Sequence, residues 1–341
     1  MRHPTHAGGP DGRRVVSLRP MDAAALAERL RAVMAGALPD VERVVDVHRL
    51  PGGASRETWS FTAARSSGAA DRFVLRRDPP GAPPSGLALE AALLHAAARA
   101  GVPVPPVIAS GDAAQGLGSA FVIMAFVEGE TIPRRVLRDD EWAPARAVLA
   151  EQCGAALAAV HRIPVDAVPG LPGGDPLAQL RDLLDRLDQP HPAFELALRW
   201  LEGTRPPPSA PAVVHGDFRN GNLIVGPEGI RAVLDWELAH VGDPVEDLGW
   251  LCVKAWRFGA PAEVGGFGSV ERLLDAYRRA GGGDVAPSTL RWWQVLGTLR
   301  WGIICIVQAM THMVGAVRSV ELAAIGRRVC EVEWDLLELL P

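Results

Sequence analysis

The hydrophobic pattern of the first eighty residues changes from a helical to a strand-like period. Residues Met21 to Leu38 carry apolar positions at helical spacing, which predicts an amphipathic first helix. The next stretch, Val41 to Ala64, has β-rich arms on both sides of a Gly-Gly pair and is typical of a β-hairpin. The run from Arg72 to Arg77 indicates a further strand. We therefore expect a small sheet that follows one helix.

The pattern then returns to helix before a second pair of strands. The alanine- and leucine-rich run from Leu87 to Ala100 predicts a helix. Two apolar runs between Pro105 and Ile132 predict two strands with a loop between them. Beyond about Thr131 helices dominate. We expect these helices over Asp140–His161, Leu177–Leu187 and His191–Glu202, and again from Asp247 onward.

Together these elements predict an α+β chain with two lobes. The length of 341 residues agrees with this, because single cores stop growing at about 250–300 residues. We expect a loose tail over residues 1–20, a sheet-containing lobe over 21–128 and a mainly helical lobe over 129–341. The sheet should be mostly antiparallel.

The charge of the chain argues against nucleic acid and membranes as partners. A formal net charge of -5 and a pI near 6.0 give no basic surface for either. The most membrane-like run, from Trp301 to Val317, is interrupted by polar residues and is shorter than the roughly 20 residues that a span needs. We expect this run to be a buried core helix.

The cysteines and the N-terminus indicate a cytoplasmic protein. The four cysteines are widely separated, form no CxxC pair, and lie mostly among apolar residues, so we expect buried, reduced thiols. They are Cys153, Cys252, Cys305 and Cys330. The first residues contain no apolar run of the kind found in secretory signals.

One stretch in the middle of the chain carries the candidate chemistry. It reads VVHGDFRNGN from Val213 to Asn222, and two short apolar runs joined by the turn GPEG follow before the sequence LDWE. That spacing predicts a small hairpin. The hairpin would bring Asn222, before its first strand, and Asp235, after its second, to the same end. Asp217 lies in the loop upstream and can reach that end too.

These residue types suit phosphoryl transfer. Asn222 and Asp235 supply hard oxygen ligands of the kind that Mg²⁺ binds together with phosphates. Asp217 could accept a proton from a hydroxyl group. Any of these residues alone could instead form a turn, bonding to its own backbone. The ordered set, HGD followed by Asn, a hairpin and DWE, favours the catalytic interpretation.

This stretch resembles the catalytic core of the aminoglycoside phosphotransferase and choline kinase superfamily, which has a protein-kinase-like fold. The resemblance covers most of the chain, roughly Val45 to Leu251. It implies that Asp217 is the catalytic base, or the group that orients the substrate hydroxyl. It also implies that Asn222 and Asp235 bind the metal. Residues that brace the loops would be His215, Asp243 and Asp247.

The same resemblance implies a nucleotide site in the first lobe. Gly52, Gly53 and Ser55 would form a loop over the phosphates, although their sequence also fits a plain hairpin turn and does not match G-x-G-x-x-G. Arg76 stands where the family usually has a lysine. A branch of the superfamily, the kinase-like domains fused to certain acyl-CoA dehydrogenases, is similar in carrying arginine there.

Two further parts of the nucleotide site follow from that alignment. Glu90, in the predicted helix, would form an ion pair with Arg76, as in the kinase template, or else be an ordinary exposed glutamate. Met124 would be the gatekeeper residue. Backbone groups around Phe126 and Val127 would meet the adenine.

The acceptor should bind in the helical lobe. Val241 to Pro341 contains twelve acidic and ten basic residues, a near-balance that argues against a polycationic acceptor. Most of the tryptophans after the motif have the helical spacing of core residues, but Trp292 and Trp293 are adjacent and must face different directions, so one could line the acceptor pocket.

The sequence therefore predicts a cytoplasmic phosphotransferase that uses Mg²⁺ and ATP, or GTP, to phosphorylate a small-molecule hydroxyl. An apolar or acidic metabolite fits the acceptor site best, and the enzyme would be a monomer or homodimer. Two alternatives stay open. One is an aminoglycoside or macrolide kinase. The other is a catalytically silent nucleotide-binding regulator, which Arg76 and the irregular glycine loop favour.

Overall fold

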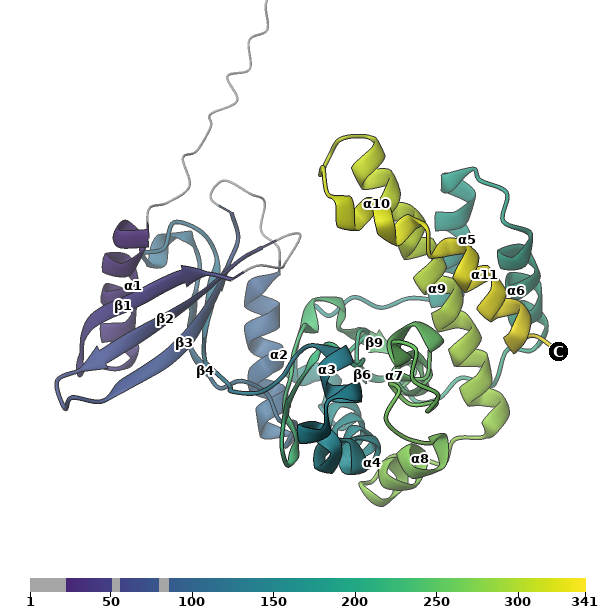
Figure 1. Cartoon of the computed structure of the whole chain (residues 1–341), viewed down its shortest axis with the longest axis horizontal. Coiled ribbons are helices and arrows are strands. Elements are labelled where there is room, and N and C mark those ends of the chain that lie inside the picture. Colours follow the sequence, from purple (N-terminus) through teal and green to yellow (C-terminus); the bar gives the residue numbers. More distant parts are fainter. Residues whose placement is uncertain (1–22, 51–55, 80–85) are drawn as a thin grey trace, which may run out of the picture. The chain divides into compact units, whose positions relative to one another are not determined.

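The structure is a computed structural model, and it describes residues 23–50, 56–79 and 86–341. Contacts between Cα atoms divide the chain into two compact units (Figure 1). The first contains the described residues up to 79 and Gly111–Phe121, and the second contains Gly86–Ser110 and Val122–Pro341. The lobes proposed over 21–128 and 129–341 remain a prediction.

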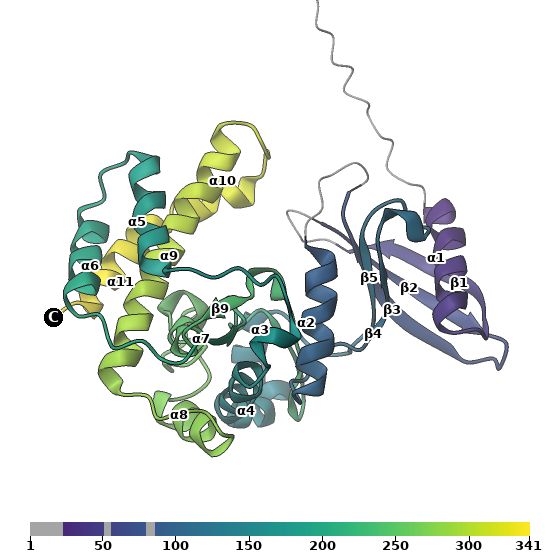
Figure 2. The ribbon, with the colours of Figure 1, turned by 180° about the vertical axis from the view of Figure 1, so that it is seen from behind.

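The first unit is built on a helix and three antiparallel strands. The bounds of these elements are α1 Ala23–Ala37, β1 Val41–Arg49, β2 Glu57–Arg65 and β3 Ala70–Arg77. The helix buries Leu26, Leu30 and Met34, which recur every four residues, and it lies along β1 (Figure 2). β1 pairs with β2 and β2 with β3. The predicted first helix, hairpin and third strand are thus confirmed.

Alternation along β3 separates the two arginines. Arg77 is fully buried and its guanidinium forms an ion pair with Glu57 at 2.7 Å, while Arg76 faces the opposite side and is half-buried.

Two further strands, β4 Val107–Gly111 and β5 Phe121–Ala125, complete a five-stranded sheet with the order β1-β2-β3-β5-β4.

The second unit is mainly helical, as the sequence predicts. Its helices are α2 Leu87–Arg99, α3 Pro133–Arg138, α4 Ala143–His161, α5 Pro176–Leu187, α6 Pro192–Gly203, α7 Val245–Leu251, α8 Val270–Arg279, α9 Pro287–Met313, α10 Val320–Gly326 and α11 Val329–Leu339. Proline occupies the first turn of several of them, where its missing N–H has no intrahelical partner to lose. The 27-residue α9 is the central helix, against which α5, α6, α7, α10 and α11 pack (Figure 1).

Short elements between these helices form the candidate site. β6 Ala212–Val214 pairs with β9 His240–Gly242, and β7 Leu223–Gly226 pairs with β8 Gly229–Val233. The predicted central hairpin is therefore confirmed. Short 3₁₀ turns lie at η1 Ala113–Gln115, η2 Asp140–Trp142, η3 Val165–Ala167, η4 Trp236–Leu238 and η5 Lys254–Arg257.

Two predictions about burial need correction. The run from Trp301 is buried only in part, because α9 ends at Met313 and the side chains of Met313 and Val314 are 71% and 74% exposed. Cys330 is also exposed, whereas the other three cysteines are buried. α11 buries Val332 and Leu336, which lie on one face, and Cys330 lies two positions earlier on the outer side. None of the described helices is both long and apolar enough to cross a membrane.

Candidate active site

A buried carboxylate holds the loop that carries the HGD motif. Asp247, near the start of α7, accepts hydrogen bonds from the backbone N–H groups of His215 and Gly216 at 2.8 and 2.9 Å. Its Oδ2 also accepts one from His161 Nε2 at 3.2 Å. Burial opposes ionisation, but the hydrogen bond and charge of His161 outweigh it and hold the pKa of Asp247 below its ordinary value. The ionised carboxylate therefore holds the backbone of the HGD loop in place through these hydrogen bonds.

His215 is a neutral link inside the same loop. Burial lowers its pKa, and the uncharged ring lies in contact with Trp236, with ring centroids 4.5 Å apart. Nε2 donates to the Leu234 carbonyl at 3.0 Å, and Nδ1 accepts from the N–H of Asp217 at 3.2 Å. The ring thus joins the loop to the residue just before Asp235.

Gly216 is required by its backbone conformation and by its surroundings. Its φ is 79°, and a Cβ added there would lie 2.4 Å from the carbonyl oxygen of Leu238. Gly101 has a similar φ of 86° but nothing within 4 Å of such a Cβ. Comparing alanine substitutions at Gly216 and Gly101 therefore distinguishes the cost of backbone strain, which both share, from the cost of the steric collision at Gly216.

We expect Gly216→Ala to destabilise the chain by about 1–2 kcal/mol more than Gly101→Ala, because the collision adds to a left-handed strain of about 1–2 kcal/mol that both variants share. Urea denaturation of both variants and the unaltered chain measures the difference. Equal losses for the two variants would show that the Leu238 backbone does not constrain this turn.

Asp217 has three hydrogen-bond donors around its carboxylate. Oδ1 accepts from Arg219 Nε at 3.0 Å and from the indole Nε1 of Trp250 at 2.9 Å. Oδ2 accepts from Asn222 Nδ2 at 2.6 Å. The side chain is 16% exposed, so it combines fixed partners with access to solvent. This geometry suits a group that receives or orients a proton at one defined place.

Asn222 and Asp235 come together as the hairpin predicts. Leu223 pairs with Val233, and the N–H of Leu234 donates to the carbonyl of Asn222 at 2.8 Å. Because Asn222 uses its amide nitrogen toward Asp217, its side-chain oxygen remains available as a ligand. Asp235 has left-handed backbone angles, φ 62° and ψ 65°, which aspartate tolerates better than most residues. Two side chains with oxygen atoms that can bind a metal ion, Asn222 and Asp235, therefore lie at one end of the hairpin.

The residues expected to brace the site differ in their surroundings. Asp247 is fully buried at the HGD loop, as described above. Asp243 lies at the edge of α7, where it accepts from the N–H groups of Val245 at 2.9 Å and Ser209 at 3.2 Å. Both carboxylates therefore bind backbone amides, which is what a bracing role requires.

The expected nucleotide residues are distributed over both units. Arg76 lies on β3 in the first unit, and Glu90 lies on α2 in the second, where it is 3% exposed. Met124, on β5, is buried, and Phe126 and Val127 follow it. Gly52, Gly53 and Ser55 lie outside the described residues. The Arg76–Glu90 pair and the nucleotide roles remain predictions.

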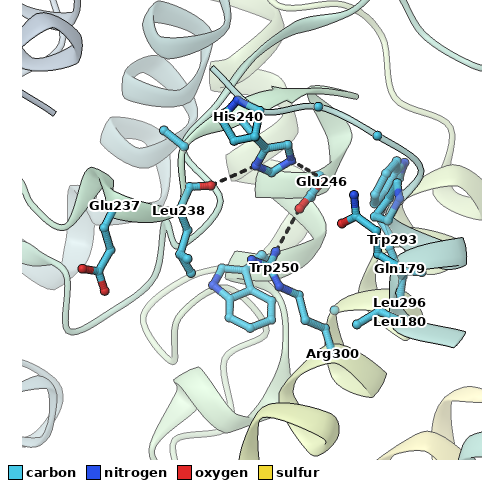
Figure 3. A pocket seen from close by; sticks show the side chains of 16 residues that line it. Gln179, Leu180, Glu237, Leu238, His240, Glu246, Trp250, Trp293, Leu296 and Arg300 are labelled. Carbon is cyan, nitrogen blue, oxygen red and sulfur yellow. Dashed lines mark hydrogen bonds and ion pairs between the residues drawn. The ribbon is translucent and has the colours of Figure 1, made fainter. Parts of the chain in front are cut away.

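A cavity of about 270 Å³ adjoins the HGD loop (Figure 3). Its walls come from α5, the turn that leads into β9, α7 and α9. Trp250 belongs both to this wall and to the hydrogen bonds of Asp217, so cavity and carboxylate are neighbours. Trp293 lines this cavity and also a second one, whereas of these two cavities Trp292 lines just the second, so the adjacent tryptophans face different directions as expected.

The buried acid of this cavity is paired with two bases. Glu246 is 6% exposed, and its two oxygens bind Arg300 at 2.9 Å and His240 at 3.1 Å (Figure 3). His240 also contacts the Leu238 carbonyl through Nδ1 at 2.9 Å. Burial opposes protonation, but Glu246 outweighs it and raises the pKa of His240. The charge of Glu246 is therefore compensated, and Glu237 is the second carboxylate of the lining.

Several site residues were not predicted from the sequence. Arg219 lies inside the quoted motif, two positions after Asp217. A basic residue so close to a carboxylate in a loop could have indicated the ion pair between them. His161, His240 and Arg300 come from other parts of the chain and have no local pattern that marks them. Trp250 was expected to be a core residue. It is buried, but its N–H points to Asp217.

The family assignment follows from comparison with known proteins. The phosphotransferase enzyme family matches residues 46–293, more than half of the chain, so the chain belongs to this family. Human acyl-CoA dehydrogenase family member 11 is 26% identical over 306 residues, which cover 82% of this chain and 38% of that protein. The predicted family and its acyl-CoA dehydrogenase-related branch are confirmed. The chain spans less than two fifths of that curated relative.

Solved structures confirm the fold. A protein from Ralstonia eutropha assigned to the aminoglycoside phosphotransferases has a TM-score of 0.71 at 22% identity, with 92% of this chain and 97% of that chain covered. A spectinomycin phosphotransferase, in complex with ADP and spectinomycin, has a TM-score of 0.63 at 13% identity, covering 92% and 99%. The chain thus has the predicted protein-kinase-like α+β fold.

Proposed function

We propose that this chain is a Mg²⁺- and ATP-dependent kinase that phosphorylates the hydroxyl of a small, apolar or acidic metabolite. One observation carries the proposal: Asp217 is hydrogen-bonded both to Asn222, at the end of the hairpin, and to Trp250, in the wall of the cavity. A base must lie within hydrogen-bond reach of the acceptor hydroxyl while that hydroxyl faces the γ-phosphate.

Each residue has a defined part in this scheme. Asp217 orients the hydroxyl and receives its proton. Asn222 and Asp235 would hold Mg²⁺, whose preference for oxygen ligands fits the free amide oxygen of Asn222 and the carboxylate of Asp235. Bound there, the ion would neutralise phosphate charge. The loops around the site are held by hydrogen bonds to their backbone groups. These bonds come from the side chains of His215, Asp243 and Asp247.

The nucleotide assignment rests on the family and on the first-unit residues. The spectinomycin phosphotransferase with this fold binds ADP. Arg76, paired with Glu90, would bind the phosphates in place of the usual lysine, and the guanidinium can do so with two parallel hydrogen bonds. Met124, Phe126 and Val127 would surround the adenine.

The cavity supports the choice of acceptor. Its volume of about 270 Å³ suits a small molecule, and its lining combines apolar side chains with the ion-paired Glu246 and a second acid, Glu237. Glu246 is already neutralised by Arg300 and His240. Glu246 therefore offers a polycation no uncompensated charge, and the apolar side chains of the lining suit an apolar or acidic metabolite.

An antibiotic kinase is the second candidate, because a neighbour of the same fold is bound to spectinomycin. A silent nucleotide-binding module is the third, and Arg76 is the observation that favours it. The set of Asp217, Asn222 and Asp235 argues for catalysis instead, because a pure binding module has no need of a hydroxyl-facing carboxylate.

Magnesium dependence should appear as a difference in thermal stability. We expect Mg²⁺-ATP at about one hundred times its dissociation constant to stabilise the chain by about 2.7 kcal/mol, and ATP with a chelator to stabilise it much less. Asp235→Asn should remove most of that difference, since one charged oxygen ligand is lost. The matched control is Asp166→Asn, at an exposed aspartate of η3. Equal stabilisation with and without Mg²⁺ in the unaltered chain contradicts the proposed metal site.

A further inference from the structure

Trp250 joins the cavity to the candidate base. It lies on α7, is 3% exposed, lines the cavity and donates its indole N–H to Asp217 Oδ1 at 2.9 Å. We propose that Trp250 is a positioning residue, which fixes the Asp217 carboxylate so that Oδ2 is the oxygen that receives the acceptor proton. This inference rests on the proposed role of Asp217 as the base.

The hydrogen bonds of Asp217 determine which oxygen is open. A carboxylate oxygen offers two lone-pair positions. Among the residues that the structure describes, Oδ1 uses both, toward Trp250 and Arg219, whereas Oδ2 uses one, toward Asn222. In the transfer step the O–H bond of the acceptor breaks and its proton goes to Oδ2. The acceptor oxygen forms its bond to the γ-phosphorus, and the bond from that phosphorus to ADP breaks.

The indole is held firmly enough to act in this way. Its ring centroid lies 5.1 Å from that of Trp256 on one hand and 5.0 Å from the Arg300 guanidinium on the other. Arg300 is fixed in turn by its ion pair with Glu246. α7 and α9 pack so closely that a Cβ added at Gly297 would come within 3.2 Å of the Trp250 ring. These contacts restrict the rotation of the ring and favour the orientation in which its N–H faces Asp217.

The guanidinium also strengthens the donor. A cation over an aromatic face draws electron density toward itself, which makes the indole N–H a better hydrogen-bond donor. Because Arg300 lines the same cavity, the group that polarises Trp250 lies beside the acceptor. The cavity wall and the catalytic carboxylate thus form one connected unit.

Trp250→Phe tests the role, because it keeps an aromatic ring and removes the N–H; the loss of ring volume that accompanies this change is shared by the control variant. We expect kcat to fall roughly tenfold or more, as for the loss of a hydrogen bond to a charged group, with the KM for Mg²⁺-ATP unchanged. Trp301→Phe is the control. Trp301 contacts Trp256 in the same cluster, and its buried Nε1 has no hydrogen-bond partner among the described residues.

A second readout needs no acceptor. In the ¹H–¹⁵N spectrum of the ten tryptophans, the indole signal that disappears in Trp250→Phe should shift in Asp217→Asn, and the Trp301 signal should not. A Trp250 signal that ignores Asp217→Asn, or a kcat for Trp250→Phe equal to that for Trp301→Phe, overturns the positioning role. If Trp250→Phe is active and Asp217→Asn is inactive, only the positioning inference fails. If Asp217→Asn retains turnover, the proposed base itself fails.

Discussion

Asp217→Asn should lower the turnover number about 10²–10⁴-fold, the usual contribution of a general base. Asparagine keeps the size of the side chain and an oxygen that can accept from Trp250 and Arg219, so the loop should retain its form. What it loses is the ability to take a proton. The affinity for Mg²⁺-ATP should therefore stay within about threefold of the unaltered value, since uniform binding is untouched.

Steady-state kinetics together with a nucleotide titration separate these effects. Asp166→Asn is the control for a general change in net charge, and it should leave both quantities as they are. A loss of nucleotide affinity as large as the loss of rate would mean that Asp217 serves binding rather than the chemical step. Full activity in Asp217→Asn would remove it from the mechanism altogether.

The largest effect on folding should come from Asp247→Ala. The substitution removes the acceptor of three hydrogen bonds, and it leaves the N–H groups of His215 and Gly216 buried without a partner. We expect a loss of about 3–5 kcal/mol in the free energy of unfolding. Denaturant unfolding measures this loss, and Asp243→Ala, which removes the acceptor of two N–H groups just before the same helix, should cost only about 1 kcal/mol.

The same carboxylate predicts how the difference depends on pH. Because the pKa of Asp247 is lowered in the folded chain, its stabilisation is present above the ordinary value of 3.8 and is lost as the pH falls through the folded value. The gap between the unaltered chain and Asp247→Ala should be constant above about pH 5 and should shrink on stronger acidification. A gap that widens in acid, or a cost no larger than that of Asp243→Ala, would show that Asp247 is not an ionised anchor.

The parts of the site that local pattern predicts are those built from neighbouring residues. The turn GPEG between two short apolar runs predicts the β7–β8 hairpin, and the hairpin alone brings Asn222 close to Asp235. Period-two alternation likewise predicts that Arg76 and Arg77 face opposite sides of β3. These features follow from geometry over a few residues.

The remaining parts depend on contacts between distant segments. Trp250 meets Asp217 across 33 residues, and His161 meets Asp247 across 86. Their sequence environments are those of ordinary core residues, so hydrophobic pattern cannot distinguish an indole that only fills space from one that also donates to a carboxylate. Cys330 was expected to be buried because of its residue type but is exposed. It lies on α11, which buries only one face, and an apolar residue on the other face of such a helix points outward.

Acceptor-dependent release of ADP from Mg²⁺-ATP is the most direct test of the proposed kinase activity. The panel should contain hydroxyacyl compounds, amino alcohols, sugars, aminoglycosides and macrolides, with Asp217→Asn assayed beside the unaltered chain. We predict that an apolar or acidic hydroxylated compound raises ADP release, that the phosphorylated compound appears by ³¹P NMR, and that Asp217→Asn loses both. ATP that binds without any compound raising ADP release would contradict the kinase proposal and favour a silent binding module.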